Sequence, residues 1–147
     1  EFVIAQRVTG EPVQVNAVAD TVQLAALQRE CRAVFCDPAL MQYAVRLVGA
    51  SRRPANYGLP DLAKHITYGA SPRATIGMIE GAKALAMLRG RRYVLPEDMV
   101  DLVPDVMRHR LVLSYEALAE DITADNIIQR LLKHITAPDK PLMHAAG

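Results

Sequence analysis

Tyr68-Gly69-Ala70-Ser71-Pro72-Arg73-Ala74 is the stretch that decides the fold, because it opens the helix that we expect to lie at the centre. Ser71 is a preferred N-cap residue, since its hydroxyl can accept a hydrogen bond from an amide one turn into the helix. Pro72 suits the first helical position, where a missing N–H costs no hydrogen bond. The pattern predicts a helix from Pro72 to about Arg89, closed by Gly90 as its C′ residue.

Arg73 is unusual in a first helical turn, because a helix N-terminus already carries about half a positive charge and disfavours cations. Free amides, the helix dipole and a guanidinium converge there, and together they suit an anion such as a phosphate. The alternative is an Arg73 that bends into solvent or pairs with a carboxylate such as Glu80. The residues alone leave both interpretations open.

Composition favours a helical protein with a substantial core. Of the 147 residues, 51% are apolar and only 5% are aromatic, and Ala, Leu and Val dominate. The formal charge of +1 gives no general indication of a nucleic acid or an anionic membrane as partner. The longest apolar run is far shorter than the ~20 residues that span a bilayer. Cys31 and Cys36 match no metal or redox spacing, so we expect reduced packing residues in a cytoplasmic protein.

Four further helices are predicted around the central one. Asp20 and Gln23 have the spacing of a capping box and predict a helix over 20–35. Asp37-Pro38 starts a second, which ends near residue 53. Pro96-Glu97-Asp98 starts another with acids in its first turn, and Pro104 should kink or split it. Thr123 caps the last helix, which ends near residue 135.

Smaller features complete the prediction of an all-α helical bundle of about five helices. Residues 92–94 and 111–113 are expected to pair as a minor two-stranded β element. Gly77 and Gly81 share one helix face, and each costs about 1 kcal/mol relative to Ala, which indicates close approach of a neighbouring backbone. In the first 19 residues, which we interpret as a linker, Val13, Val15 and Val18 are expected to lie against the bundle.

The residues that commonly carry enzyme chemistry are mostly missing from this sequence. It has no glycine-rich phosphate loop, no paired acids after an apolar run to hold Mg²⁺, and four scattered histidines without metal-ligand spacing. We therefore predict no metal site. Glu97-Asp98 is better explained by the helix dipole than by acid–base catalysis. A small hydrolase with Cys31 and His65 as nucleophile and base is the third and weakest hypothesis.

A second hypothesis rests on the basic residues Arg89, Arg91, Arg92, Arg108 and Arg110. If they gather, they form a patch that can contact phosphates, as expected of a stand-alone helical adaptor that binds protein or nucleic acid. No aromatic residues alternate with them to stack bases. A solvated face or a subunit contact is therefore the simpler interpretation.

Several motifs together resemble the MoxR family of AAA+ ATPases. They are Gly69-Ala70-Ser71-Pro72-Arg73-Ala74, the helix start Asp37-Pro38-Ala39-Leu40-Met41-Gln42-Tyr43, the segment Gly90-Arg91-Arg92-Tyr93-Val94-Leu95-Pro96-Glu97-Asp98-Met99, and His109-Arg110-Leu111. The one departure is Leu95, where the family usually has a Ser or Thr cap.

The resemblance implies the C-terminal helical lid of such an ATPase. Residues 1–19 would then be the linker from an absent α/β ATPase core, 20–137 the AAA+ lid and 138–147 a flexible C-terminal tail. Arg73 matches the sensor-2 arginine, the catalytic position that reaches the terminal phosphates of ATP. Ser71, Pro72, Arg73 and, bordering the adenine, Tyr43 would be the nucleotide-binding residues.

The same resemblance implies the partners and the activity. Because the chain does not begin with Met, we expect a fragment whose core, with its P-loop and the acids that hold Mg²⁺, lies upstream. The fragment alone should neither retain ATP nor hydrolyse it, although the parent would be an ATP hydrolase. Expected partners are its own core, neighbouring subunits of a hexameric ring and a von Willebrand A-type protein, but not a membrane or nucleic acid. Family members act in chaperone-like remodelling or cofactor insertion.

Overall fold

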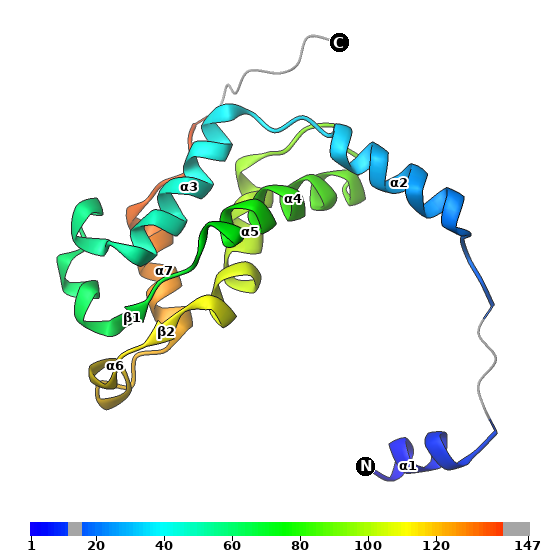
Figure 1. The fold of residues 1–147 in the computed structure, drawn as a ribbon, viewed down its shortest axis with the longest axis horizontal. Helices are drawn as coiled ribbons and strands as arrows, with labels where there is room; N and C mark the ends of the chain where they lie inside the picture. Colours follow the sequence, from blue (N-terminus) through cyan, green and yellow to red (C-terminus); the bar gives the residue numbers. More distant parts are fainter. Residues whose placement is uncertain (12–15, 140–147) are drawn as a thin grey trace.

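The computed structural model describes residues 1–11 and 16–139 and confirms a predominantly helical fold with one small β element (Figure 1). Its elements are α1 (Phe2–Thr9), α2 (Thr21–Ala33), α3 (Pro38–Arg52), the 3₁₀ helices η1 (Pro54–Tyr57) and η2 (Pro60–His65), β1 (Ile66–Tyr68), α4 (Pro72–Leu88), α5 (Pro96–Met107), the 3₁₀ helix η3 (Arg108–Arg110), β2 (Val112–Leu113), α6 (Tyr115–Ala119) and α7 (Ala124–His134). No described helix has both the length and the apolar character needed to cross a membrane.

The core lies where α3, α4, α5 and α7 pack together. Its largest fully buried side chains are Leu40, Leu47, Val48, Leu62, Met78, Met99, Val103, Met107, Ile127, Ile128 and Leu131. As predicted, α4 is central, because it packs against α2, α3 and α5. It is not the most buried helix, since α3 buries a larger share of its residues. Alanines form most of the buried stripe of α4 and let its neighbours approach closely.

Most of the predicted helix starts are confirmed with their caps. Asp20 and Gln23 form both hydrogen bonds of the capping box, at 2.7 and 2.9 Å. Asp37 accepts from the Ala39 amide at 2.7 Å, and Thr123 accepts from the Asn126 amide at 3.2 Å. Pro104 does not split its helix, because α5 continues to Met107. The core packing of that last turn outweighs the one hydrogen bond that proline removes.

The predicted pairing of residues 92–94 with 111–113 is wrong. β2 pairs antiparallel with β1 instead, with Ile66 opposite Leu113. Residues 92–94 run beside the connection between α2 and α3, where the Phe35 amide donates to the Arg92 carbonyl at 2.9 Å. The strand that was missed lies inside the Pro- and Gly-rich connection 54–70, whose composition is typical of a loop.

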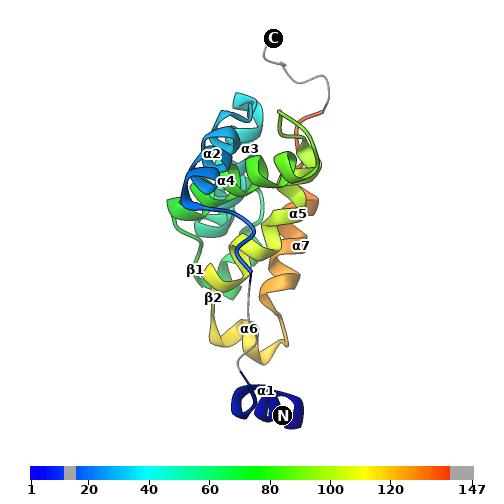
Figure 2. The ribbon, with the colours of Figure 1, turned by 90° about the vertical axis from the view of Figure 1, so that its right-hand side faces the viewer.

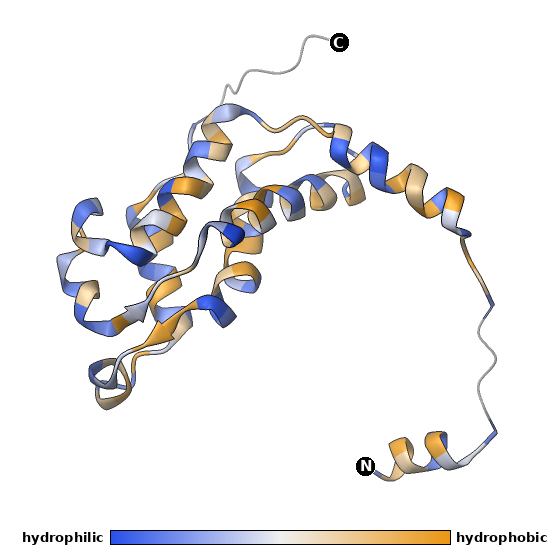
Figure 3. Ribbon diagram, in the orientation of Figure 1, coloured by the Kyte–Doolittle hydropathy of each residue, from blue (hydrophilic) through white to orange (hydrophobic). Residues whose placement is uncertain are grey.

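The apolar residues before α3 pack less than predicted. Val18 is 98% exposed, not held against the bundle, and Val13 and Val15 lie outside the described residues. The apolar residues of α2 are also largely open, because Leu24 and Leu27 are 53% and 49% exposed. Figures 1 and 2 show α1 apart from the bundle, and Figure 3 marks hydrophobic residues along α1 and α2. Among the described residues, α4 packs against part of α2 and leaves these leucines half exposed.

The close backbone approach predicted for Gly77 and Gly81 occurs at Gly69 instead. A Cβ on Gly69 would lie 2.3 Å from the Ser51 carbonyl oxygen and 2.5 Å from the Arg52 nitrogen, so no larger residue fits. At Gly77 and Gly81 the nearest atoms belong to side chains of α5, at 4.0 and 3.2 Å. Gly69 therefore lets the start of α4 lie directly on the end of α3.

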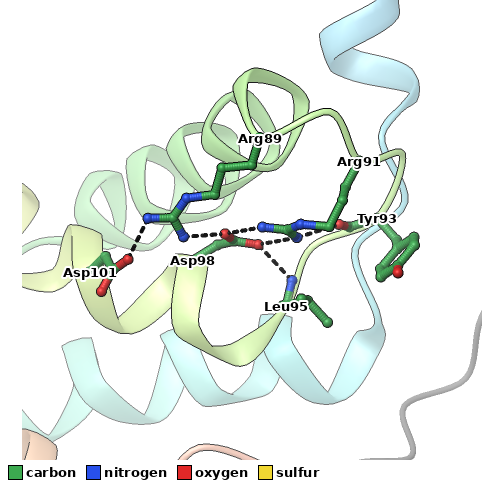
Figure 4. A network of polar contacts seen from close by, with 6 residues as sticks. All are labelled: Arg89, Arg91, Tyr93, Leu95, Asp98 and Asp101. Carbon is green, nitrogen blue, oxygen red and sulfur yellow. Dashed lines mark hydrogen bonds and ion pairs between the residues drawn. The ribbon is translucent and has the colours of Figure 1, made fainter.

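A buried carboxylate joins the end of α4 to the start of α5 (Figure 4). The Asp98 side chain is fully buried and accepts hydrogen bonds from Arg91 at 2.6 and 2.7 Å and from Arg89 at 2.8 Å. It also accepts from the Leu95 amide at 2.8 Å, which satisfies the helix start where the sequence lacks a Ser or Thr cap. Gly90, in the left-handed region with φ 73°, makes the turn between the two arginines.

The Asp98 carboxyl group has a pKa below its ordinary value despite its burial. Burial raises the pKa, but hydrogen bonds from Arg91, the Leu95 amide and Arg89 outweigh it by favouring the charged form. A lowered folded pKa stabilises the fold at pH values above the ordinary carboxyl pKa. That contribution disappears as the pH falls through the folded value.

We expect Gly69→Ala to lower the free energy of unfolding by about 1–3 kcal/mol, because the new methyl group meets backbone atoms that cannot move aside. Gly77→Ala is the matched control. Its methyl group has room, so helix propensity should raise stability by up to about 1 kcal/mol. Chemical denaturation of both variants measures the difference. Equal effects would contradict the proposed close approach.

Asp98→Asn should lower the free energy of unfolding by about 3 kcal/mol at pH 7. The substitution removes the buried negative charge that accepts hydrogen bonds from Arg89 and Arg91. The difference in the free energy of unfolding between the variant and the wild type should stay constant down to about pH 4. It should shrink below that pH, where the wild-type Asp98 carboxylate becomes protonated and loses its charge. Urea unfolding at several pH values measures both. The control is Asp101→Asn, since the exposed Asp101 contacts Arg89 at 2.7 Å and should contribute less than about 1 kcal/mol. A pH-independent difference would refute this role of Asp98.

Candidate functional site

Arg73 lies in the first turn of α4 with its side chain exposed. It forms no hydrogen bond or ion pair with any residue that the structure describes, and Glu80 is not its partner. Of the alternatives considered from sequence, the pairing with a carboxylate of the same chain is therefore not observed. The guanidinium is available to an anion from outside the described residues.

Ser71 stands at the predicted N-cap position, but its hydroxyl does not cap the helix. The backbone there is extended, with φ −76° and ψ 168°, and the Ala74 amide donates to the Ser71 carbonyl at 2.8 Å. Pro72 occupies the first helical turn as predicted. Two polar side chains at one helix end, those of Ser71 and Arg73, thus remain without a partner in the described chain. The positive pole of the α4 dipole therefore has no side-chain cap in the described chain.

The segment before Arg73 is held by α3, a feature that sequence reasoning missed. The Ala70 amide donates to Ser51 Oγ at 3.0 Å, and the Arg52 guanidinium donates to the Ala70 carbonyl at 3.0 Å. Both Ser51 and Ala70 are fully buried. The only feature of the sequence that points to this contact is Gly69, because a larger residue would not fit against the Ser51 backbone.

Tyr43 lies in the core, not at the helix end that carries Arg73. Its side chain is 2% exposed, and burial raises the pKa of its hydroxyl. It borders a shallow pocket of about 330 Å³, whose other lining residues belong to α3 and to residues 136–139. That pocket includes neither Ser71 nor Arg73. Tyr43 thus lies within α3, whereas Ser71, Pro72 and Arg73 lie at the start of α4. The structure does not gather the four predicted nucleotide-binding residues in one pocket.

The five arginines of the second hypothesis do not form one free basic patch. Arg89 and Arg91 bind Asp98, and Arg108 binds Asp125 at 2.8 Å. Arg110 donates to the Val106 carbonyl at 2.6 Å. The Arg92 side chain remains exposed without a polar partner in the described parts of the chain. Most of the positive charge that the sequence places here is neutralised locally.

The thiols and histidines are not arranged for nucleophilic catalysis. Cys36 is buried, and burial raises the pKa of its thiol, which disfavours the reactive thiolate. Cys31 is half-buried, and no contact joins it to His65. The buried His65 instead places Nε2 3.1 Å from Glu120. Among residues 1–11 and 16–139 no three His, Cys, Asp or Glu side chains gather in a way that could hold a metal ion.

Comparison with known proteins identifies relatives of this chain. Residues 61–131, which include Arg73 and Asp98, match the family model of the AAA lid domain. The chain is 42% identical over 135 residues to the chaperone MoxR1 of Mycobacterium tuberculosis, covering 92% of this chain and 36% of that protein. It is 35% identical over 112 residues to the protein MoxR of Methylorubrum extorquens, covering 72% of this chain and 32% of that protein.

A solved structure has the same fold. The crystal structure of a protein from Cytophaga hutchinsonii assigned as an ATPase superposes with a TM-score of 0.82 at 35% identity, covering 94% of this chain and 42% of that one. The chain thus spans about a third of the length of the curated relatives it matches. Residues 61–131 form an AAA lid domain, and the chain belongs to the MoxR family of AAA+ ATPases.

Proposed function

We propose that this chain is the nucleotide-sensing lid of a MoxR-type ATPase and that Arg73 is its sensor-2 residue. The observation that carries the proposal is the exposed guanidinium without a partner in the described chain, placed in the first turn of a long helix. An exposed arginine of this kind, at the positive end of a helix dipole, is suited to the terminal phosphates of ATP.

The chemistry of Arg73 would be electrostatic. Phosphoryl transfer develops charge on the transferred group, and a positioned cation stabilises that charge without taking part in covalent chemistry. The P-loop and the acids that bind Mg²⁺ would come from the α/β core. In this proposal Ser71 and Pro72 shape the helix end that meets the phosphates, and Tyr43 acts farther away at the adenine side. Its burial means that only a small part of its ring is available there.

We also propose the division into a linker (1–19), a lid (20–137) and a tail (138–147). The exposed apolar residues of α1 and α2, among them Phe2, Ile4 and Leu24, support this division. They are the surfaces that a core domain would cover, since exposed apolar patches commonly mark interaction sites. Closure of the core on the lid would then couple nucleotide state to the lid angle.

For the whole protein we propose a ring of subunits, with six as the expected number, that acts in chaperone-like remodelling or cofactor insertion. The description of the mycobacterial relative as a chaperone supports the first activity. A von Willebrand A-type partner and a cytoplasmic location stay predictions from the sequence.

Arg73→Ala should lower kcat for ATP hydrolysis by about 100-fold in the protein that includes the α/β core, because one donor to the transition state is lost. Steady-state ATPase assays measure this change. Arg92→Ala is the matched control, since Arg92 is also exposed without a described partner and should leave turnover unchanged. Turnover at the wild-type level in the Arg73→Ala protein would remove Arg73 from the mechanism.

A further inference from the structure

We propose that Ser51, at the end of α3, is a positioning residue that fixes Arg73 relative to the rest of the lid. This inference rests on the proposed role of Arg73. Ser51 is far from Arg73 in the sequence and is fully buried, so it cannot contact a nucleotide itself. Its effect on ATP hydrolysis would pass entirely through the start of α4.

The Ser51 hydroxyl connects α3 to the segment that precedes Arg73. Ser51 Oγ donates to the Val48 carbonyl at 2.8 Å and accepts from the Ala70 amide at 3.0 Å. The first contact fixes the direction of the hydroxyl, because its proton is used within α3. The oxygen therefore presents a lone pair to Ala70, which lies three residues before Arg73. Without the hydroxyl, the Ala70 amide would be buried without this partner.

Two other contacts hold the same segment on α3. The Arg52 guanidinium donates to the Ala70 carbonyl at 3.0 Å, so both backbone polar groups of Ala70 are bonded to side chains of α3. Gly69 lies so close to the Ser51 backbone that a Cβ would come within 2.3 Å of its carbonyl oxygen. The segment is thus seated on α3 by two hydrogen bonds and a tight backbone contact.

The helix does not position its own first turn in the usual way. An N-cap side chain normally fixes where a helix begins, but the Ser71 hydroxyl makes no such bond. The location of the first turn of α4 therefore depends on α3 through Ser51 and Arg52. A phosphate contact is sensitive to displacements of about 1 Å, so loosening this attachment should slow catalysis without removing the guanidinium.

The test is a double-mutant cycle in the ATPase that includes the α/β core, with kcat and KM for ATP measured for Ser51→Ala, Arg73→Ala and the double variant. Ser51→Ala should lower kcat about tenfold, less than the loss from misplacement by a full ångström, with a smaller change in KM. In the Arg73→Ala background the same substitution should have almost no further effect, because its route to the nucleotide is already gone.

Ser114→Ala is the matched control. The Ser114 hydroxyl also bridges two backbone groups, donating to the Lys64 carbonyl at 2.6 Å and accepting from the Ala117 amide at 3.2 Å, but it does not contact the segment before Arg73. It should leave kcat within twofold of the wild type. If Ser51→Ala does not fold, as judged by circular dichroism and melting temperature, Arg52→Ala takes its place in the cycle, with a several-fold loss of kcat expected.

The outcomes separate this inference from the proposed function. If Arg73→Ala has no effect, both fail. If Arg73→Ala slows hydrolysis but Ser51→Ala does not, Arg73 keeps its role and the inference about Ser51 is overturned. It is also overturned if the two losses multiply in the double variant, or if Ser114→Ala lowers kcat as much as Ser51→Ala does.

Discussion

The hydrogen bond from the Ala70 amide to Ser51 Oγ is the contact that seats the start of α4 on the end of α3, and we infer that the placement of Arg73 depends on it. It joins the end of α3 to the start of α4 at a point where the two backbones lie so close that only glycine fits at position 69. The opposite end of α4 is fixed by a second polar contact, the binding of Arg89 and Arg91 to the buried Asp98. The helix α4 is thus attached at both ends by polar contacts, and its alanines pack in the core between them.

These two junctions use their charges differently. At the Asp98 junction, Arg89 and Arg91 bind a carboxylate of the same chain (Figure 4), so their charges stabilise the fold. At the other end of α4, the backbone polar groups of Ala70 are satisfied by Ser51 and Arg52, while the Arg73 side chain has no partner among the residues that the structure describes. Arginines at the two ends of α4 therefore differ in their contacts, because a carboxylate is within reach of Arg89 and Arg91 and the described residues offer none to Arg73.

Local patterns predicted much of the fold, because caps and helix periodicity depend on residues close in sequence. The starts of α2, α3, α4, α5 and α7 all lie where Asp20, Asp37, Pro72, Pro96 and Thr123 indicate. Contacts between distant segments were missed, including the pairing of β1 with β2 and the seating of Gly69 on Ser51. A dipeptide such as Glu97-Asp98 likewise gives no sign that arginines will enclose its second member. The sequence drew attention to Arg73 because its misfit with the helix dipole is a local property, and its role toward ATP stays a prediction.

The open surface of α2 has a consequence for how this domain moves. None of its residues is buried, so its helical hydrogen bonds receive little support from the core. Segments of this kind open with a low local free energy, while the bundle behind them stays intact. Amide protons of α2 should thus exchange with solvent much faster than those of α3 or α4, and a change in the direction of α2 would disturb little packing beyond its contacts with α4.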